Sequence, residues 1–200
     1  MHGHSKMLMD REREQQLVNQ AKQNIEAFEE LYDYYLPKIY GYILNRVGHR
    51  QEAEDLTSQT FAKVLTALSR YEDRGISFSA WVYRIATNVI IDNARKRREY
   101  AMDPEIIMDS VAGTKITSPE EQICLLESGE ELRHCMEKLK DDYQSVLSMK
   151  FFEEMDNREI AEVLECRPSA VAVKVHRALK ALKKEVENFQ LSQNDNYVEL

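Results

Sequence analysis

The sequence predicts an all-α protein made of two small helical domains that an acidic flexible linker joins. Three observations predict this fold class. Long stretches are rich in Ala, Leu, Glu, Lys, Gln and Arg, which favour helix. Only 6 Gly and 4 Pro occur in 200 residues, which is few for the tight turns of an all-β sandwich. Apolar residues recur every three or four positions in two separate blocks, and this length suits one or two domains.

The chain divides by pattern into five parts. The stretch "AMDPEIIMDSVAGTKITSPEEQ" has no sustained apolar period and contains Pro, Gly and Ser, so it is interpreted as a linker. The polar tail is expected to fray. The predicted parts are an N-terminal extension (1–19), a first helical domain (20–99), a linker (100–118), a second helical domain (119–187) and a tail (188–200).

Three helices are predicted in the first domain. The first, "NIEAFEELYDYYLPKIYGYILNRV", contains Pro37, which either bends the chain or begins another helix, and Gly48 is expected to end it. In "RQEAEDLTSQTFAKVLTALSRY" and "SFSAWVYRIATNVIIDNARKRRE" the predicted buried stripes are Ala53, Leu56, Thr60, Val64 and Leu68, and Val82, Ile85, Ala86, Val89 and Ile90. The other faces carry Glu52, Asp55 and Gln59 on the former helix, and Arg84, Asn88, Ile91 and Arg95 on the latter.

The second domain has a helix-turn-helix pattern. A start signal stands at Ser118-Pro119-Glu120-Glu121, and Asp141 is expected to cap the helix "DYQSVLSMKFFEE". Asp156 is expected to cap the short helix "NREIAEVLE", with Glu159 at the capping-box position. Pro168 then opens a basic helix. Its predicted apolar stripe is Val171, Val175, Ala178, Leu179 and Leu182.

Positive charge gathers on two helices, although the whole chain has a formal net charge of −8. Residues 100–142 hold eleven acids and four bases (4 − 11 = −7), whereas residues 166–184 hold six bases and no acid. A further basic run, 95–98, ends the helix that precedes the linker. Blocks of opposite charge therefore predict two basic surfaces on an acidic protein.

Each charged surface has two interpretations. The last helix is either an ordinary solvated face or a groove-inserted helix, whose Arg and Lys contact phosphates and whose first turns reach base edges. The run 95–98 either complements the helix dipole or, with Asn88, holds a single strand. The aromatics upstream of Asn88 either stack on bases or pack in the core, and the core is favoured for Trp81. The acidic face formed by Glu52, Asp55 and Gln59 is either solvated or docks a basic or polar helix of a partner.

The composition also excludes several classes. No apolar run of about 18 residues occurs, so no membrane insertion is expected. The start of the chain lacks a signal-peptide core. Three widely spaced cysteines, Cys124, Cys135 and Cys166, indicate a reducing cytosol rather than a disulfide framework or a zinc cluster. We find no phosphate loop, metal-spaced His/Cys set or nucleophile–base arrangement, so no enzyme activity, cofactor or metal site is expected.

Taken in order, three stretches resemble a bacterial RNA polymerase sigma factor of the sigma-70 family. They are "EAEDLTSQTFAKVL", "SFSAWVYRIATNVIIDNARKRR" and "NREIAEVLECRPSAVAVKVHRALKALKK". The match is to the extracytoplasmic-function (ECF) subfamily, reduced to its second and fourth domains, and it covers residues 20–186. The resemblance implies a cytoplasmic factor that binds core RNA polymerase and directs promoter recognition, melting and initiation. It also implies control by an anti-sigma factor.

The resemblance further implies a role for particular residues. One helix of this chain would dock on the coiled coil of the largest polymerase subunit, through Glu52, Asp55, Leu56, Gln59 and Thr60. The −10 element would be melted and read by Tyr71, Phe78, Trp81, Arg84, Asn88, Asp92, Arg95, Lys96, Arg97 and Arg98. The −35 element would be read by Arg167, Ser169, Ala170, Val173, Lys174, His176, Arg177 and Lys180. The second domain would lie on the polymerase flap, and the acidic linker would pass through the polymerase toward the RNA exit path.

The chain departs from the family pattern at Ala172 and Val173, where relatives often carry a basic and a small polar residue. This departure shifts the expected −35 contacts toward Lys174, His176 and Arg177. Two other functions remain open at this point. A stand-alone helix-turn-helix regulator would bind a promoter tightly without polymerase, and a helical adaptor would have no effect on DNA.

Overall fold

The structure, a computed structural model, describes residues 9–73, 75–101 and 122–198. Side chains are described except for Arg98, Tyr100, Ala101, 122–128 and 190–198. Every regular element in these residues is a helix, which confirms the predicted all-α class. The elements are α1 (Arg11–Ala21), α2 (Glu26–Val47), α3 (Arg50–Ala67), the 3-10 turn η1 (Leu68–Arg70), α4 (Phe78–Ala101), α5 (Gln122–Glu137), α6 (Asp141–Phe151), α7 (Asn157–Val163) and α8 (Pro168–Val198). Among them, no helix is both long and apolar enough to cross a membrane.

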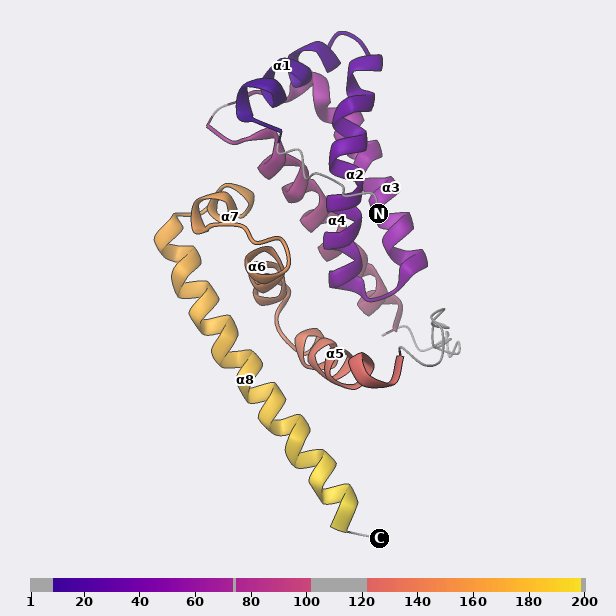
Figure 1. The fold of residues 1–200 in the computed structure, drawn as a ribbon, viewed down its shortest axis with the longest axis vertical. Coiled ribbons are helices and arrows are strands. Elements are labelled where there is room, and N and C mark those ends of the chain that lie inside the picture. The colour runs from indigo at the N-terminus through magenta and orange to yellow at the C-terminus, as the bar shows by residue number, and fades with distance from the viewer. Residues whose placement is uncertain (1–8, 74, 102–121, 199–200) are drawn as a thin grey trace.

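Helices α1 to α4 form one bundle (Figure 1). Ile39 and Ile43 of α2 are fully buried in its centre, and each such burial stabilises the fold by about 1.5–3 kcal/mol. The predicted stripes of α3 and α4 are buried as expected, except that Ile85 is only half-buried. Helix α2 continues through Pro37, so of the two alternatives the start of a new helix at this proline is wrong. Gly48 ends α2 in the left-handed conformation (φ 70°), as predicted.

The predicted domain boundary at residue 20 falls inside helix α1. Leu17, Val18 and Ala21 are buried in the core of the bundle. Asp10 caps the helix, because its side chain accepts a hydrogen bond from the Arg13 N–H at 2.8 Å. The apolar stripe of α1 is short and the surrounding sequence is polar, so the apolar periodicity did not predict this helix.

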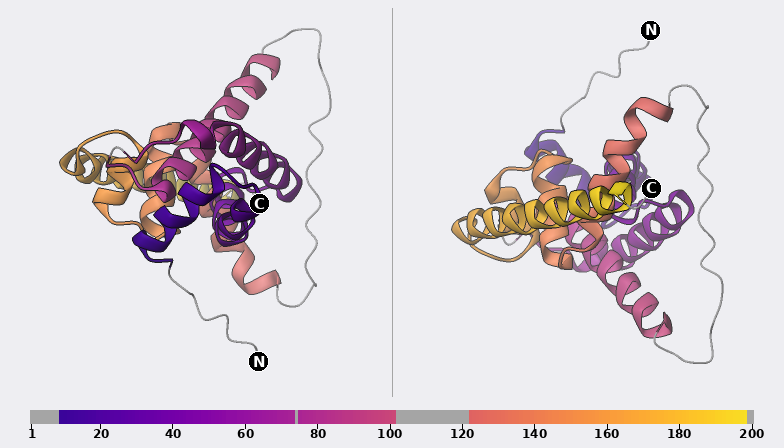
Figure 2. Two further views of the ribbon diagram at one scale, coloured as in Figure 1. Left: turned by 90° about the horizontal axis from the view of Figure 1, so that it is seen from above. Right: turned by 90° about the horizontal axis from the view of Figure 1, so that it is seen from below.

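Helices α5 to α8 form the second domain, with α8 packed along the other three (Figures 1 and 2). The capping box of Asp156 and Glu159 on α7 is present as predicted. The predicted cap at Asp141 is wrong: Lys140 holds the cap position without a side-chain bond, and Asp141 is the first residue of α6. An acid in that first turn still complements the helix dipole.

Helix α8 is longer than the sequence predicted. It runs to Val198, so the tail expected to fray after Asn188 is helical, and no Gly or Pro in that stretch ends the helix. Leu179, predicted on the buried stripe, is 41% exposed. Val171 and Ala178 of the same stripe are fully buried, so Leu179 lies at its edge. The predicted linker and the start signal before Gln122 lie outside the described residues, apart from Tyr100 and Ala101 at the end of α4.

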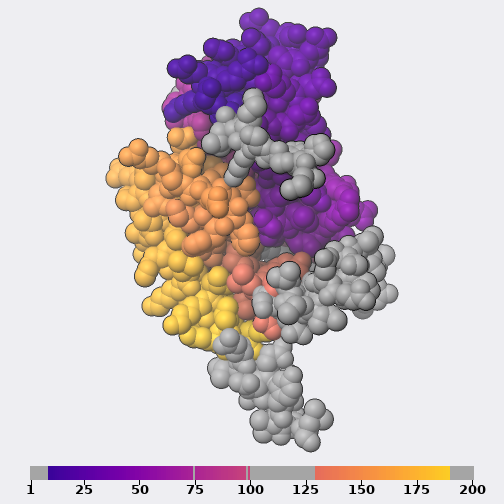
Figure 3. Space-filling model, viewed as in Figure 1, coloured from indigo at the N-terminus to yellow at the C-terminus, as the bar shows by residue number. Residues whose placement is uncertain are grey.

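The two domains pack against each other (Figure 3) through α4 with α7 and α2 with α6. Tyr83 of α4 donates to Glu153 at 2.6 Å, and buried Arg46 of α2 donates to Ser145 of α6 at 2.5 Å. Arg133 of α5 donates to the Gly48 carbonyl at 3.1 Å. We call this packing the closed arrangement.

Candidate nucleic-acid and protein interfaces

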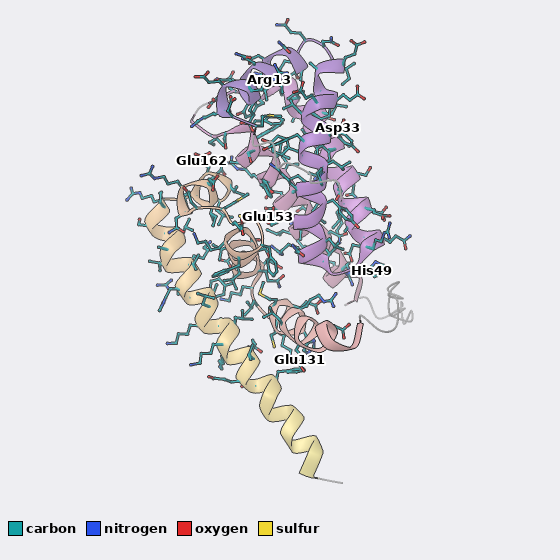
Figure 4. All side chains as sticks on the ribbon, in the orientation of Figure 1. Arg13, Asp33, His49, Glu131, Glu153 and Glu162 are labelled. Carbon is teal, nitrogen blue, oxygen red and sulfur yellow. The ribbon has the colours of Figure 1, made fainter. Side chains whose placement is uncertain are left out.

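The acidic face predicted on α3 lies on the surface. Asp55 and Gln59 are exposed and Glu52 is half-buried. With His49 at the start of α3 (Figure 4), Gln51, Leu56 and Asn93, they line a hollow of about 270 Å³. A concave, mostly polar surface with two carboxylates fits a basic or polar segment of another protein.

Leu56 and Thr60, two of the residues predicted to contact polymerase, are buried in the first domain. The Thr60 hydroxyl donates to the Leu56 carbonyl at 2.7 Å, within α3. Both residues also lie on the predicted buried stripe, and that pattern decides their place. Both side chains hold α3 in the bundle, and Leu56 also reaches the floor of the hollow beside the acidic face.

A cluster of polar contacts joins the acidic face to α4. Asn93 donates to the Glu52 carboxylate at 2.6 Å, and Arg97 forms an ion pair with it at 3.0 Å. The Arg97 side chain is 70% exposed, so this pair contributes little stability and can exchange for other partners. The surface expected to bind protein and the surface expected to bind DNA therefore meet at Glu52.

Helices α3 and α4 border a second, open hollow, which we call the α3–α4 hollow. Its volume of about 350 Å³ is in the range of roughly 300–1,000 Å³ that small-molecule sites occupy. It is lined by Lys63, Ala67, Ile85, Asn88, Ile91 and Asp92. The Asn88 amide can both donate and accept, the Asp92 carboxylate accepts and the Lys63 ammonium donates. These groups can hydrogen-bond the edge of an unpaired base.

The structure adds Lys63 to the predicted residues of this site. Lys63 and Ala67 lie one turn apart on α3, and both line the α3–α4 hollow. The sequence offered one signal for Lys63, since it and Arg50 are the two basic residues of α3. Nothing in the sequence alone placed it opposite Asn88.

The basic end of α4, formed by Arg95, Lys96 and Arg97, is exposed. Arg95 forms ion pairs along its own helix with Asp92 at 3.4 Å and Glu99 at 3.9 Å. The Arg98 side chain lies outside the described residues. Because Asp92 lines the α3–α4 hollow, its partner Arg95 lies beside that hollow, and the exposed cations of this helix end suit contacts with the backbone of a strand whose base enters it.

The aromatic residues predicted to stack on bases form a packed cluster. Tyr71 and Phe78 are 8% and 2% exposed, and their ring centroids lie 5.4 Å apart. Trp81 is half-buried against both rings, at 4.9 Å and 5.5 Å. Tyr71 and Phe78 are therefore core residues in this structure and do not offer stacking surfaces.

Arg84, predicted to face DNA beside Asn88, instead contacts α7. Its guanidinium donates to the carbonyls of Glu162 at 2.6 Å and Val163 at 3.2 Å, and it pairs with Glu165. A cation at the last carbonyls of a helix is favoured by their unsatisfied acceptors and by the helix dipole. In return, Glu162 accepts from the N–H and the hydroxyl of Ser77, just before α4, at 3.1 Å and 2.9 Å. Glu162 and Glu153 lie on the part of the second domain that faces the first (Figure 4).

The predicted −35 residues lie at and near the start of α8. Lys174 is half-buried and pairs with Asp142 of α6 at 3.3 Å. All the others are exposed, namely Arg167, Ser169, Ala170, Val173, His176, Arg177 and Lys180. The capped helix α7 and a short turn lead directly into α8, whose first turns present these exposed side chains, and a major groove admits an α-helix.

Comparison with known proteins assigns both domains to known families. The family model for Sigma-70 region 2 matches residues 31–100, and that for Sigma-70 region 4 matches residues 129–182. The chain is 31% identical over 175 residues to the ECF RNA polymerase sigma factor SigW of Bacillus subtilis, covering 82% of this chain and 90% of the relative.

The chain is an ECF sigma factor of the sigma-70 family.

A further relative of this sigma factor is the RNA polymerase sigma factor YlaC of Bacillus subtilis, which is 33% identical over 159 residues, 80% of this chain and 91% of the relative. Two solved structures share the fold. CnrH, in complex with the cytosolic domain of CnrY, has a TM-score of 0.64 at 21% identity, covering 88% of this chain and 97% of that one. RpoE of Bartonella quintana, in complex with the anti-sigma factor NepR, has a TM-score of 0.61 at 20% identity, covering 80% and 96%.

Family membership decides the function in outline. Sigma factors are transcription-initiation factors that direct RNA polymerase to promoters, and this ECF sigma factor contains both matched regions in the expected order. A stand-alone helix-turn-helix regulator is not favoured, because such a protein would not explain the match to region 2. Helix α1 lies outside both matched segments.

Proposed function

We propose that this ECF sigma factor binds core RNA polymerase through the acidic face of α3, while its second domain lies on the polymerase flap. Asp55 and Gln59 are exposed on one side of a polar hollow, where a basic or polar helix of the largest subunit fits by charge and shape. Leu56 and Thr60 keep this face in place from inside the bundle.

At the −10 element, a base extruded from the stack enters the α3–α4 hollow. Asn88 and Asp92 hydrogen-bond its edge, while Arg95, Lys96 and Arg97 hold the strand backbone. Unstacking a base costs a few kcal/mol, and these contacts offset that cost only when the polymerase holds the DNA in place. The observation that carries this proposal is the hollow itself, with polar groups beside a row of exposed cations.

At the −35 element, the first turns of α8 enter the major groove. His176, Arg177 and Lys174 reach base edges, and Arg167 and Lys180 contact phosphates. Lys174 must first leave Asp142, a half-exposed pair of little net stability.

Promoter binding also requires the closed arrangement to open. Arg84 lies one helical turn before Asn88, and its partner Glu165 lies two residues before Arg167, so the two DNA-reading faces meet at this contact. Elements named −35 and −10 lie about 25 base pairs apart, or roughly 85 Å at 3.4 Å per base pair. The closed arrangement is therefore a resting state of the free protein, and polymerase holds the domains apart.

Regulation and location follow from the family. Two solved structures with this fold are described as complexes with CnrY and with the anti-sigma factor NepR, and we expect this chain to have an anti-sigma partner. Pull-downs that recover polymerase subunits but never a small second protein would count against such a partner. The protein performs no covalent chemistry itself and acts in the cytoplasm, where it meets core polymerase.

Run-off transcription tests the proposal as a whole. Core polymerase is assayed with and without the full chain on a library of genomic promoters. The expected result is a new set of start sites that appears only with the chain. Unchanged start sites would overturn the proposal, and tight promoter binding without polymerase would support the stand-alone regulator instead.

A further inference from the structure

Helix α1, which neither family model covers, carries a buried carboxyl group. Glu14 is 8% exposed, and burial raises the pKa of this carboxyl above its ordinary value. A buried carboxyl is costly unless hydrogen bonds satisfy its oxygens. The Tyr35 hydroxyl donates to Glu14, and the backbone N–H groups of Phe78 and Ser79 approach the same carboxyl.

Those N–H groups belong to the first turn of α4. In the first turn of a helix, the backbone N–H groups have no acceptor within the helix itself. Glu14 lies beside the start of the helix whose next turns carry Asn88 and Asp92: it shares a small hollow with Phe78, and the ring of its partner Tyr35 lies 5.6 Å from that of Phe78. Ser77, one residue earlier, is bound by Glu162 from the second domain. The start of α4 is held from two sides, by α1 within its own domain and by α7 across the closed arrangement.

Helix α1 also braces the turn that leads into α4. Gln15 donates to Asp73 at 3.3 Å, and the Lys22 ammonium lies 5.5 Å from the centroid of the Tyr71 ring. Within the turn, the Tyr71 hydroxyl donates to the Ile76 carbonyl at 2.8 Å. Glu14, Gln15 and Lys22 of α1 line one small hollow together with Tyr71, Asp73 and Phe78, so α1 lies directly beside this part of the chain.

We propose that Glu14 is a positioning residue for promoter opening, which fixes the start of α4 and the Tyr71–Ser77 turn relative to the strand-reading face. This inference depends on the proposed role of α4 at the −10 element. When polymerase separates the domains, Glu162 leaves Ser77, and Glu14 is the remaining side chain of the two that holds this helix end. Its contribution is therefore larger in the holoenzyme than in the free protein.

Two substitutions separate hydrogen bonding from packing. Glu14→Gln keeps a side-chain oxygen for Tyr35 and for the N–H groups of α4. Glu14→Leu keeps the volume but leaves these donors without an acceptor. Ile39→Val and Ile39→Ala weaken the same core from α2, where Ile39 is fully buried, and their thermal midpoints are chosen to bracket that of Glu14→Leu.

The test uses full-length variants with core polymerase and one promoter that depends on the wild-type chain. Three quantities are measured: affinity for core polymerase, permanganate reactivity of unpaired thymines near −10, and transcription from a template already unpaired there. For Glu14→Leu we expect unchanged affinity for core polymerase and normal transcription from the unpaired template. Promoter opening should fall about tenfold, because the hydrogen bonds to the buried carboxyl are lost. Glu14→Gln should open the promoter nearly as well as wild type.

Three results would overturn the inference. Equal loss of opening in the Ile39 variant of matched stability would show that Glu14 acts only through stability. A parallel loss of polymerase affinity would place its effect on docking, and failure of the unpaired template to rescue would place it after opening. A wild-type chain that opens no promoter would instead overturn the proposed function, which is a separate outcome.

Discussion

The side chains predicted to contact DNA stand differently in the two domains. On α8 they project from the surface, and only Lys174 is half-buried in a contact with another helix. In the first domain, Arg84 contacts α7, Arg97 pairs with Glu52, and Tyr71 and Phe78 lie in the core. The proposed −35 surface is therefore already exposed in this structure, whereas the proposed −10 surface would be complete only after other contacts are exchanged. Duplex DNA can dock on an exposed helix, but a melted strand needs a site that forms as the strand appears.

The largest effect is expected at the acidic face of α3. In the proposed function, both DNA-binding surfaces act only when this face is bound to polymerase. Asp55→Arg should weaken core-polymerase binding about 100-fold, because it places a cation against a basic partner in the interface. Glu54→Arg is the matched control, since Glu54 is the neighbouring exposed acid and pairs with Arg50 away from the hollow. Fluorescence anisotropy with labelled chain measures both affinities. Equal losses for the two variants would contradict a specific docking face.

The next effect sharpens the contrast at −10. Asn88→Ala should change base preference at one position of the −10 element, at a cost of about 1–3 kcal/mol for the preferred base. Arg97→Ala, in the exposed basic end, should lower transcription from all −10 variants by a similar factor. Transcription from a promoter library with every −10 substitution measures both. A uniform loss for Asn88→Ala would remove it from base reading.

On α8, Lys180→Ala should weaken all promoters by a similar factor and lower the slope of log affinity against log salt by about one, as expected for a phosphate contact. Arg177→Ala should instead alter preference among −35 sequences. Holoenzyme binding to promoter fragments at several salt concentrations measures the slope. An unchanged slope for Lys180→Ala would show that this lysine does not touch a phosphate.

Opening the closed arrangement should have a smaller effect. Glu162→Ala removes the acceptor for Ser77 and should raise binding of the free chain to a single-stranded −10 oligonucleotide a few-fold, because the two domains then separate more readily. Glu131→Ala, an exposed acid on α5, serves as the control. If both variants bind as weakly as wild type, the closed arrangement does not limit access to α4.

The smallest effect concerns stability and pH. Burial raises the pKa of Glu14, so its contribution to stability is fully present below the ordinary carboxyl pKa and is lost as pH rises through the raised value. Glu14→Gln cannot ionise and should raise the thermal midpoint by a few degrees at pH 8. The gain should vanish near pH 4. Thermal unfolding across this range measures the difference, and a gain that grows toward low pH would contradict it.

Much of the fold follows from patterns that local chemistry decides. The stripes of α3 and α4, the capping box of Asp156 and the helix end at Gly48 all need only nearby residues. Helix α1 was not predicted, because three buried apolar residues in a polar stretch make a weak periodic signal. The end of α8 was not predicted, because a polar stretch without Gly or Pro carries no signal that either extends or ends a helix.

The candidate site was less predictable, because most of its contacts join distant parts of the chain. The sequence placed Asn88 and Asp92 on an outer helix face but could not place Lys63 opposite them. Arg84 has the spacing of a surface residue, and only the packing of α7 on α4 gives it carbonyl partners 78 and 79 residues away. Leu56 and Thr60 fitted both a family role and a buried stripe, and their burial follows the stripe.

The central claim is that the two DNA-reading faces are together in the free protein and apart on the polymerase. Spin or fluorescent labels at Glu29 of α2 and Lys138 near α5, both exposed, report the distance between the domains. We predict one short-distance population in the free chain and an increase of tens of ångströms when core polymerase and promoter DNA are added, as the roughly 85 Å between the elements requires. An unchanged distance in a transcribing complex would contradict the claim.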